Sequence, residues 1–212
     1  MKAISAVDIC NLALSQLGDK RVTTIEAPAT ATEQICALHY DTTRQSLFRK
    51  HLWNFAKKRV VLTRLNTAPS FDYTDQYQLP NDYMRLIKVS STDDTRFDHR
   101  DYDVEEGKLL LNANGATTVN LVYVFDQTVV AKWDTLFKTL CYLTLAKVIC
   151  YDITRKATLK EALMAEIERM EANVKAIDGQ ERPPRRVERS RFVESRRQLS
   201  NYAKTYVDVE GF

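Results

Sequence analysis

The chain has 212 residues, of which 44% are hydrophobic and 28% are charged, and its formal net charge is +3. This length and composition are those of an ordered globular protein with a sizeable core, and they argue against disorder throughout the chain. Five widely spaced glycines exclude the GxGxxG and GxxxxGK[ST] nucleotide loops, and no apolar run reaches the about 20 residues of a membrane helix.

Two helices are predicted in the N-terminal quarter. Residues 5–8 resemble a helix-capping box, an apolar run follows, and Gly18 is a suitable residue to end the helix. Because nearly every face of this helix is apolar, we expect it to be deeply buried or shared with a neighbouring molecule. A second, longer helix is expected to begin at Thr30, with Glu33 completing a capping box, and to end near Trp53.

The sequence period changes between residues 58 and 125, where short β-like runs replace the helical spacing. Strands are expected near residues 60–65, 77–80, 86–89, 108–111 and 119–125. The dipeptides Glu106-Gly107 and Asn114-Gly115 are typical of tight turns, and the second is a strong hairpin signal. This segment therefore predicts a small antiparallel sheet inserted between helices.

Helical spacing returns near Thr135 and predicts a helix of about five turns that reaches Cys150. A further helix is expected to start at Thr158, with Glu161 completing a capping box, and to end at Gly179. Its apolar residues recur every three or four positions, which indicates one buried face.

Together these elements predict an α+β protein with three parts. A helical bundle body of about four helices comprises residues 1–57 and 126–179, a β domain is inserted at 58–125, and an extended C-terminal arm covers 180–212. Within the arm, the segment 181–197 carries seven arginines and three glutamates. That segment contributes +4 to the net charge of +3, which leaves the remainder of the chain at −1.

Catalytic and metal-binding constellations have little support in the sequence. The three histidines are isolated and the four cysteines form no CxxC pair, so we expect no metal, no cofactor, and free thiols in a reducing compartment. The carboxylates of residues 93–106 could belong to a glycan hydrolase, but a solvated hairpin rim explains the same residues without special geometry and is favoured. No serine or cysteine nucleophile has a recognisable activating context, so we expect no enzyme.

The arginine-rich arm is the strongest candidate for a binding site. Arginine forms paired hydrogen bonds with carboxylates, the prolines limit the conformations of the unbound segment, and the interleaved glutamates favour a mixed-charge protein surface. Binding to DNA phosphates, with a steep salt dependence, is the alternative. The residues that we expect to dock are Arg182, Pro183, Pro184, Arg185, Arg186, Arg189, Arg191 and Phe192.

A cluster of aromatic residues follows the second predicted helix. Trp53, Asn54 and Phe55 could line a ligand pocket, or they could form a structural staple that joins this helix to the sheet. The staple is the simpler interpretation, because large aromatic side chains contribute strongly to cores.

Four segments occur in an order and spacing that a known family shares. They are Ser5-Ala-Val-Asp8 with Leu14-Ser-Gln-Leu-Gly18 and Val22-Thr-Thr-Ile-Glu26; Leu52-Trp53-Asn54-Phe55; Leu79-Pro80-Asn81-Asp82-Tyr83-Met84-Arg85-Leu86; and Tyr102-Asp103-Val104 with Gly107-Lys108-Leu109. Over residues 4–177 the chain resembles the tail tubular protein A family, the head-to-tail adaptors (gatekeepers) of short-tailed bacteriophages. The structural motif residues carried by the resemblance are Trp53, Asn54, Phe55, Leu79, Pro80, Asp82 and Tyr83.

The resemblance implies a structural virion protein rather than an enzyme. Such adaptors form a twelvefold ring between the portal protein and the tail nozzle protein, and genome DNA passes through its channel without sequence-specific binding. Their helical bodies pack side by side, the C-terminal arm reaches the portal, and the sheet faces the nozzle or neighbouring subunits. For this chain it implies a homo-oligomer at the head–tail junction, synthesised in the bacterial host cytoplasm, with no membrane partner.

Overall fold

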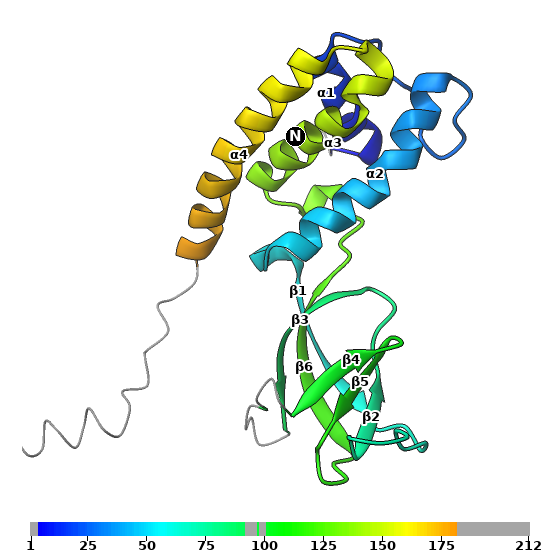
Figure 1. Ribbon diagram of the computed structural model, residues 1–212, viewed down its shortest axis with the longest axis vertical. Helices are drawn as coiled ribbons and strands as arrows, with labels where there is room; N and C mark the ends of the chain where they lie inside the picture. The colour runs from blue at the N-terminus through cyan, green and yellow to red at the C-terminus, as the bar shows by residue number, and fades with distance from the viewer. Residues whose placement is uncertain (1–3, 92–96, 98–100, 182–212) are drawn as a thin grey trace, which may run out of the picture. The chain divides into compact units, whose positions relative to one another are not determined.

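The helices and strands are taken from a computed structural model, which describes residues 4–91, 97 and 101–181. The described residues contain four α-helices, two short 3-10 helices and six strands (Figure 1). The protein therefore has an α+β fold, as the sequence predicts. Residues Met1–Gly179 form one unit, and Gln180–Phe212 form a second unit, of which only the first two residues are described.

Helices α1 (Ala6–Leu17), α2 (Ala31–Lys50), α3 (Thr135–Thr154) and α4 (Ala157–Gln180) form the helical body. Helix α1 packs on α3 and buries Ile9, Cys10, Ala13 and Leu14, whereas Leu12 is exposed. The expected burial is therefore confirmed for one face of the helix only. Gly18 ends α1 in the left-handed conformation at φ 72°, which glycine adopts without strain.

Both predicted capping boxes at the N-terminal helices are present. The Ser5 hydroxyl accepts from the backbone N–H of Asp8, and the Thr30 hydroxyl accepts from that of Glu33. Backbone N–H groups of Thr30, Ala29 and Thr23 donate to the Glu33 carboxylate and lower its pKa to about 2. Glu33 thus fixes the preceding loop as well as the start of α2.

Three expected helix boundaries are wrong. Helix α2 ends at Lys50 rather than near Trp53, because His51 is extended and the Trp53 indole N–H donates to the carbonyl of Leu47. Helix α4 begins at Ala157, so Thr158 lies in its first turn and does not cap it. Gly179 lies inside α4 and does not adopt a positive φ there, so it does not stop the helix.

The inserted segment forms two three-stranded sheets, where the sequence predicted one. Both are antiparallel, with strand orders β1-β6-β3 and β2-β5-β4. A single layer would leave the inward apolar residues of β5 and β6 uncovered, and the second sheet covers them. The strands are β1 (Lys57–Thr63), β2 (Asp75–Gln78), β3 (Tyr83–Ser90), β4 (Tyr102–Glu105), β5 (Lys108–Leu111) and β6 (Thr118–Phe125).

The two predicted turns have the same backbone form but different roles. Glu106 and Gly107 both have positive φ and connect β4 to its neighbour β5, as a two-residue hairpin requires. Asn114 and Gly115 also have positive φ, yet they connect β5 to β6, which belong to different sheets. The hairpin expected at Asn114-Gly115 is therefore wrong, because its chain crosses from one layer to the other.

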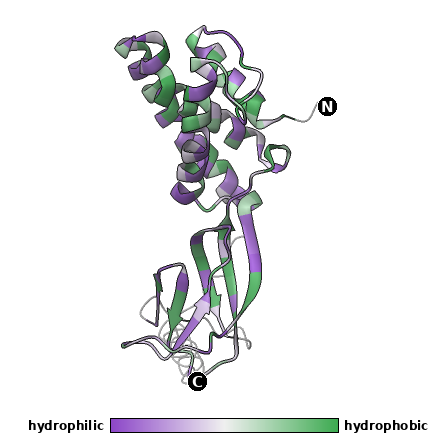
Figure 2. Cartoon of the chain, turned by 90° about the vertical axis from the view of Figure 1, so that its right-hand side faces the viewer, coloured by the Kyte–Doolittle hydropathy of each residue, from purple (hydrophilic) through white to green (hydrophobic). Residues whose placement is uncertain are grey.

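Two hydrophobic cores lie along the first unit. The helical core contains Phe48, Trp53 and Phe137, and the core between the two sheets contains Leu109 and Tyr123, among others. Strand β6 contributes to both cores, since Tyr123 lies in the β core and the next residue, Val124, lies in the helical core. Hydrophobic residues, green in Figure 2, accordingly occur along both the helices and the strands.

Candidate functional site

The Trp53–Phe55 segment is packed into the helical core. Trp53 is 2% exposed, and its indole N–H donates to the Leu47 carbonyl at 2.8 Å. The Trp53 ring packs edge-on against Phe137 of α3, with ring centroids 4.9 Å apart. The Phe55 ring also packs against Phe137, with centroids 5.1 Å apart. The 3-10 helix η1 (Asn54–Ala56) then leads directly into β1. This packing supports the structural staple rather than a ligand pocket.

The predicted Leu79–Tyr83 segment forms the turn that enters β3. Leu79 is buried in the β core, and the Pro80 carbonyl accepts from the backbone N–H of Tyr83 at 3.0 Å. The Tyr83 ring stacks on Tyr123 of β6 with centroids 5.9 Å apart. The segment therefore holds β3 beside the central strand of its sheet.

Asp82 ties three strands together at the end of the β domain nearest the helices. Its carboxylate accepts from the Lys58 ammonium of β1 at 2.7 Å and from the Tyr123 hydroxyl at 2.8 Å. Burial raises the pKa of Asp82, but the hydrogen bonds from Lys58 and Tyr123 outweigh it, and the net pKa is lowered. The Asp82 backbone carbonyl also accepts from the N–H of Asp126, just beyond β6.

Asp126 connects this end of the β domain to the helical body. Its two carboxylate oxygens accept from the Arg44 guanidinium of α2 at 3.0 and 2.8 Å. Arg44 is only 6% exposed, and its other terminal nitrogen lies 2.7 Å from Asp41. Paired Arg–carboxylate bonds fix geometry as well as charge. The sequence analysis missed this joint, although a charged residue at an inward position of α2 could have signalled it.

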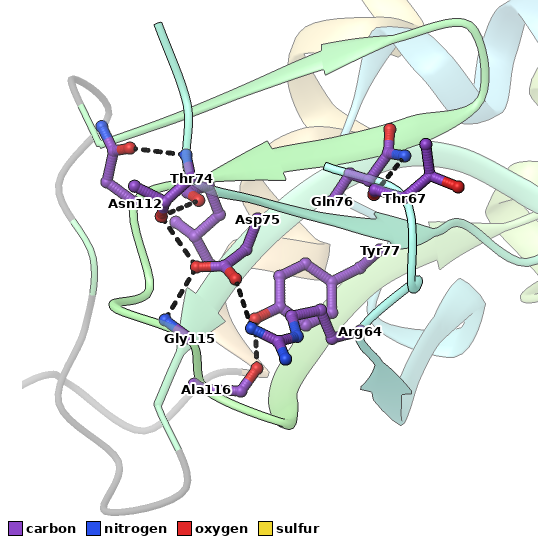
Figure 3. A network of polar contacts seen from close by, with 10 residues as sticks. Arg64, Thr67, Thr74, Asp75, Gln76, Tyr77, Asn112, Gly115 and Ala116 are labelled. Carbon is purple, nitrogen blue, oxygen red and sulfur yellow. Dashed lines mark hydrogen bonds and ion pairs between the residues drawn. The ribbon is translucent and has the colours of Figure 1, made fainter. Parts of the chain in front are cut away.

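A second polar network lies within the β domain and centres on Asp75 (Figure 3). Asp75 is 3% exposed, and its carboxylate accepts from Arg64 at 3.0 Å, from the Thr74 hydroxyl at 2.7 Å, and from the Gly115 N–H at 3.0 Å. Burial raises the pKa of Asp75, but these three donors outweigh it and lower the net value. The network therefore holds the crossing between the two sheets. The sequence did not lead us to predict this Asp75 network either.

The loop between β1 and β2 is anchored by the residues around that network. The Gln76 side-chain amide donates to the Thr67 carbonyl at 2.6 Å, and the Asn112 side chain accepts from the Thr74 N–H at 3.0 Å (Figure 3). Within this anchored loop, Phe71 is 77% exposed, the largest exposure of any large hydrophobic residue that the structure describes. Exposed aromatic side chains on fixed loops are suited to protein contacts.

A cavity of about 340 Å³ lies beside Phe71, between its loop and the β4–β5 hairpin. Of the predicted acidic stretch, Glu105 and Glu106 line this cavity, and Asp103 is exposed on β4. Burial, Asp103, Glu105 and Asp72 raise the pKa of Tyr73, which also lines it. Asp93, Asp94 and Asp98 lie outside the described residues. Asp72, Glu105 and Glu106 thus place three carboxylates along the cavity beside Phe71.

No protein-family model and no curated protein sequence matches this chain.

The expected arm residues, from Arg182 to Phe192, lie outside the described residues. Across residues 4–91, 97 and 101–181, no three histidine, cysteine or carboxylate side chains are grouped to hold a metal ion. In the same part of the chain, no helix has both the length and the apolar character to cross a membrane. All four cysteines are buried free thiols.

Proposed function

We propose that the protein is a structural, non-enzymatic head-to-tail adaptor of a short-tailed bacteriophage, and that its copies form a ring between portal and tail nozzle. The observation that supports this most is where the segments that resemble the tail tubular protein A family lie in the fold. Leu52–Phe55 closes the helical core beside the start of β1, and Asp82 joins the strands at the same end of the β domain.

Asp82, in one of these segments, also takes part in the bonds that join the helical body to the β domain. The Asp82 carbonyl binds the N–H of Asp126, whose carboxylate binds the buried Arg44. An adaptor that is held between two different assemblies needs such a joint, because a loose one would let its binding surfaces move independently. In the proposed ring the arm docks on the portal, and many weak contacts act together through avidity.

The portal contact is tested by charge reversal in the arm of the full chain. Replacing Arg182, Arg185 and Arg186 with glutamate is expected to weaken binding to the portal ring of the same genome about a hundredfold, because arginine–carboxylate pairs become repulsive in every copy. Light scattering measures the mass of the protein alone, of the portal, and of their mixture over a titration.

The matched control carries the same change in charge on the helical body, at the exposed residues Lys20, Lys132 and Lys160. This control is expected to bind the portal like the wild-type protein. If both variants bind alike, the arm is not the docking element. If the wild-type protein leaves the portal mass unchanged, the adaptor function itself is wrong, and a salt-dependent loss of DNA binding in the arm variant would favour the DNA alternative.

The β domain supplies a second contact in this proposal, and Phe71 is its expected anchor. Phe71→Ser is expected to weaken binding of the nozzle protein to the assembled ring about tenfold, since exposed aromatic anchors dominate interfaces. Thermal unfolding should change little, because the side chain is exposed. Leu38→Ser, at a 70% exposed residue of α2, is the control. Equal nozzle binding by both variants would show that Phe71 makes no such contact.

A further inference from the structure

The buried face of α4 ends on a charged residue. Its inward positions are Leu163, Ile167 and Val174, and the next position on the same face is Asp178, which is only 9% exposed. An apolar residue there would continue the stripe, whereas a carboxylate in such a place must find hydrogen-bond donors. Asp178 is also the last inward residue of α4 before the arm.

The donors come from the segment that leaves α2. One Asp178 carboxylate oxygen accepts from the backbone N–H of Asn54 at 2.9 Å, and the other lies 2.9 Å from His51 Nε2. The Asn54 side-chain amide donates to the Asp178 carbonyl at 2.5 Å. The side-chain carboxylate and the backbone carbonyl of Asp178 therefore both accept hydrogen bonds from Asn54, which lies 124 positions earlier in the chain.

Asn54 is the first residue of the 3-10 helix η1, so the backbone N–H that donates to Asp178 is the first N–H of that helix. The residue before it, Trp53, provides no side-chain cap for η1. An N-cap carboxylate normally accepts a hydrogen bond from a backbone N–H in the first turn of its own helix. Asp178 accepts such a bond from η1, although Asp178 belongs to α4. Because Trp53 packs edge-on against His51 at 4.7 Å, the cap also rests on the helical core.

A second polar contact joins the same two elements two turns earlier. Glu171 of α4 pairs with Lys50 at the end of α2 and with Lys175, whose ammonium is 3.1 Å away. Burial raises the pKa of Glu171, but its two lysine partners outweigh it and lower the net value. The last turns of α4 are thus held by polar side chains as well as by Val174.

We propose that Asp178 is the positioning residue of the arm: its contacts with His51 and Asn54 hold the end of α4 on the helical body, so that the arm starts from a fixed point. We call these contacts the Asp178 latch. The role in docking rests on the proposed adaptor function. When the first residue of the arm is held in place, the free arm can adopt fewer conformations. Docking then costs less conformational entropy, so the arm binds the portal with higher affinity.

The latch is tested in the full chain with Asp178→Ala and with Glu168→Ala, an exposed position of the same helix, as the control. Hydrogen exchange of the amides 174–181 is expected to become at least tenfold faster in Asp178→Ala and to stay unchanged in the control. Binding to the portal ring is expected to become about fivefold weaker in Asp178→Ala only. Asp178→Asn is expected to retain most of the protection, because its amide oxygen still accepts from Asn54.

The outcomes separate the latch from the adaptor function. Unchanged exchange at 174–181 in Asp178→Ala overturns the latch, whatever the portal result. Faster exchange with undiminished portal binding overturns the positioning role and leaves the adaptor function standing. If the wild-type protein fails to join the portal, the adaptor function and the docking role both fall, while the exchange result still decides whether Asp178 holds the helix end.

Discussion

Replacing Trp53 with alanine is expected to lower the free energy of unfolding by about 4 kcal/mol. The ring is almost fully buried and packs against Phe137, Phe55 and His51, so its removal leaves a cavity that close-packed neighbours fill only in part. The change also removes the indole N–H that donates to the Leu47 carbonyl, which is one of the last backbone acceptors of α2. Urea unfolding followed by far-ultraviolet circular dichroism measures the loss.

A second variant at this position and a control on α3 complete the test. Trp53→Phe keeps an aromatic ring but removes the indole N–H, so we expect a smaller loss of about 2 kcal/mol. Tyr151→Ala removes a half-exposed aromatic residue of α3 and is expected to cost under about 1 kcal/mol. Losses of similar size for Trp53→Ala and Tyr151→Ala would mean that Trp53 is not a structural staple.

Replacing Asp75 with alanine is expected to cost about 3 kcal/mol, because buried partners lose their acceptor. The Gly115 N–H and the Thr74 hydroxyl are left without the carboxylate, and Arg64 loses its ion pair. Urea unfolding at pH 7 measures the loss. Asp103→Ala, at an exposed carboxylate of β4, is the control and is expected to change stability by under about 0.5 kcal/mol.

The same network predicts how stability depends on pH. The folded pKa of Asp75 lies below its unfolded value. Its contribution is therefore complete above the unfolded pKa, which is about 4, and it disappears as the pH falls through the folded pKa. The difference in unfolding free energy between wild type and Asp75→Ala should be constant from pH 7 to about 5 and shrink below about pH 4. A difference that grows on acidification would contradict the assigned direction.

Local signals predicted the helices well and the sheet arrangement poorly. The capping boxes at Ser5 and Thr30 use contacts three residues apart, so the sequence contains everything that decides them. The pairing of β2 and β4 with β5, and of β1 and β3 with β6, depends on contacts between distant segments. Asn114-Gly115 shows the limit clearly, since its turn conformation was predictable and its strand partners were not.

The polar contacts that were missed share a recognisable pattern. Asp75 has the same parity in the strand alternation as the buried Tyr77, and Asp178 falls on the inward stripe of α4. Arg44 likewise occupies an inward position of α2. A charged residue at an inward position must be paired when buried, so the sequence could have marked these three residues. Their long-range partners could not be named from the sequence, because Asp126 is distant from Arg44 in the chain, Gly115 from Asp75, and Asn54 from Asp178.

The antiparallel pairing of β1 with β6 places the entrance and the exit of the β domain side by side. Lys57, the first residue of β1, is the register partner of Val124, next to the last residue of β6. Paired Cα atoms in such strands are about 5 Å apart, so the chain enters the β domain after α2 and leaves it before α3 at nearly the same place. The insertion of the β domain therefore does not by itself force α2 and α3 apart, and Met84, Ile87 and Arg85 of β3 add contacts to the helical body.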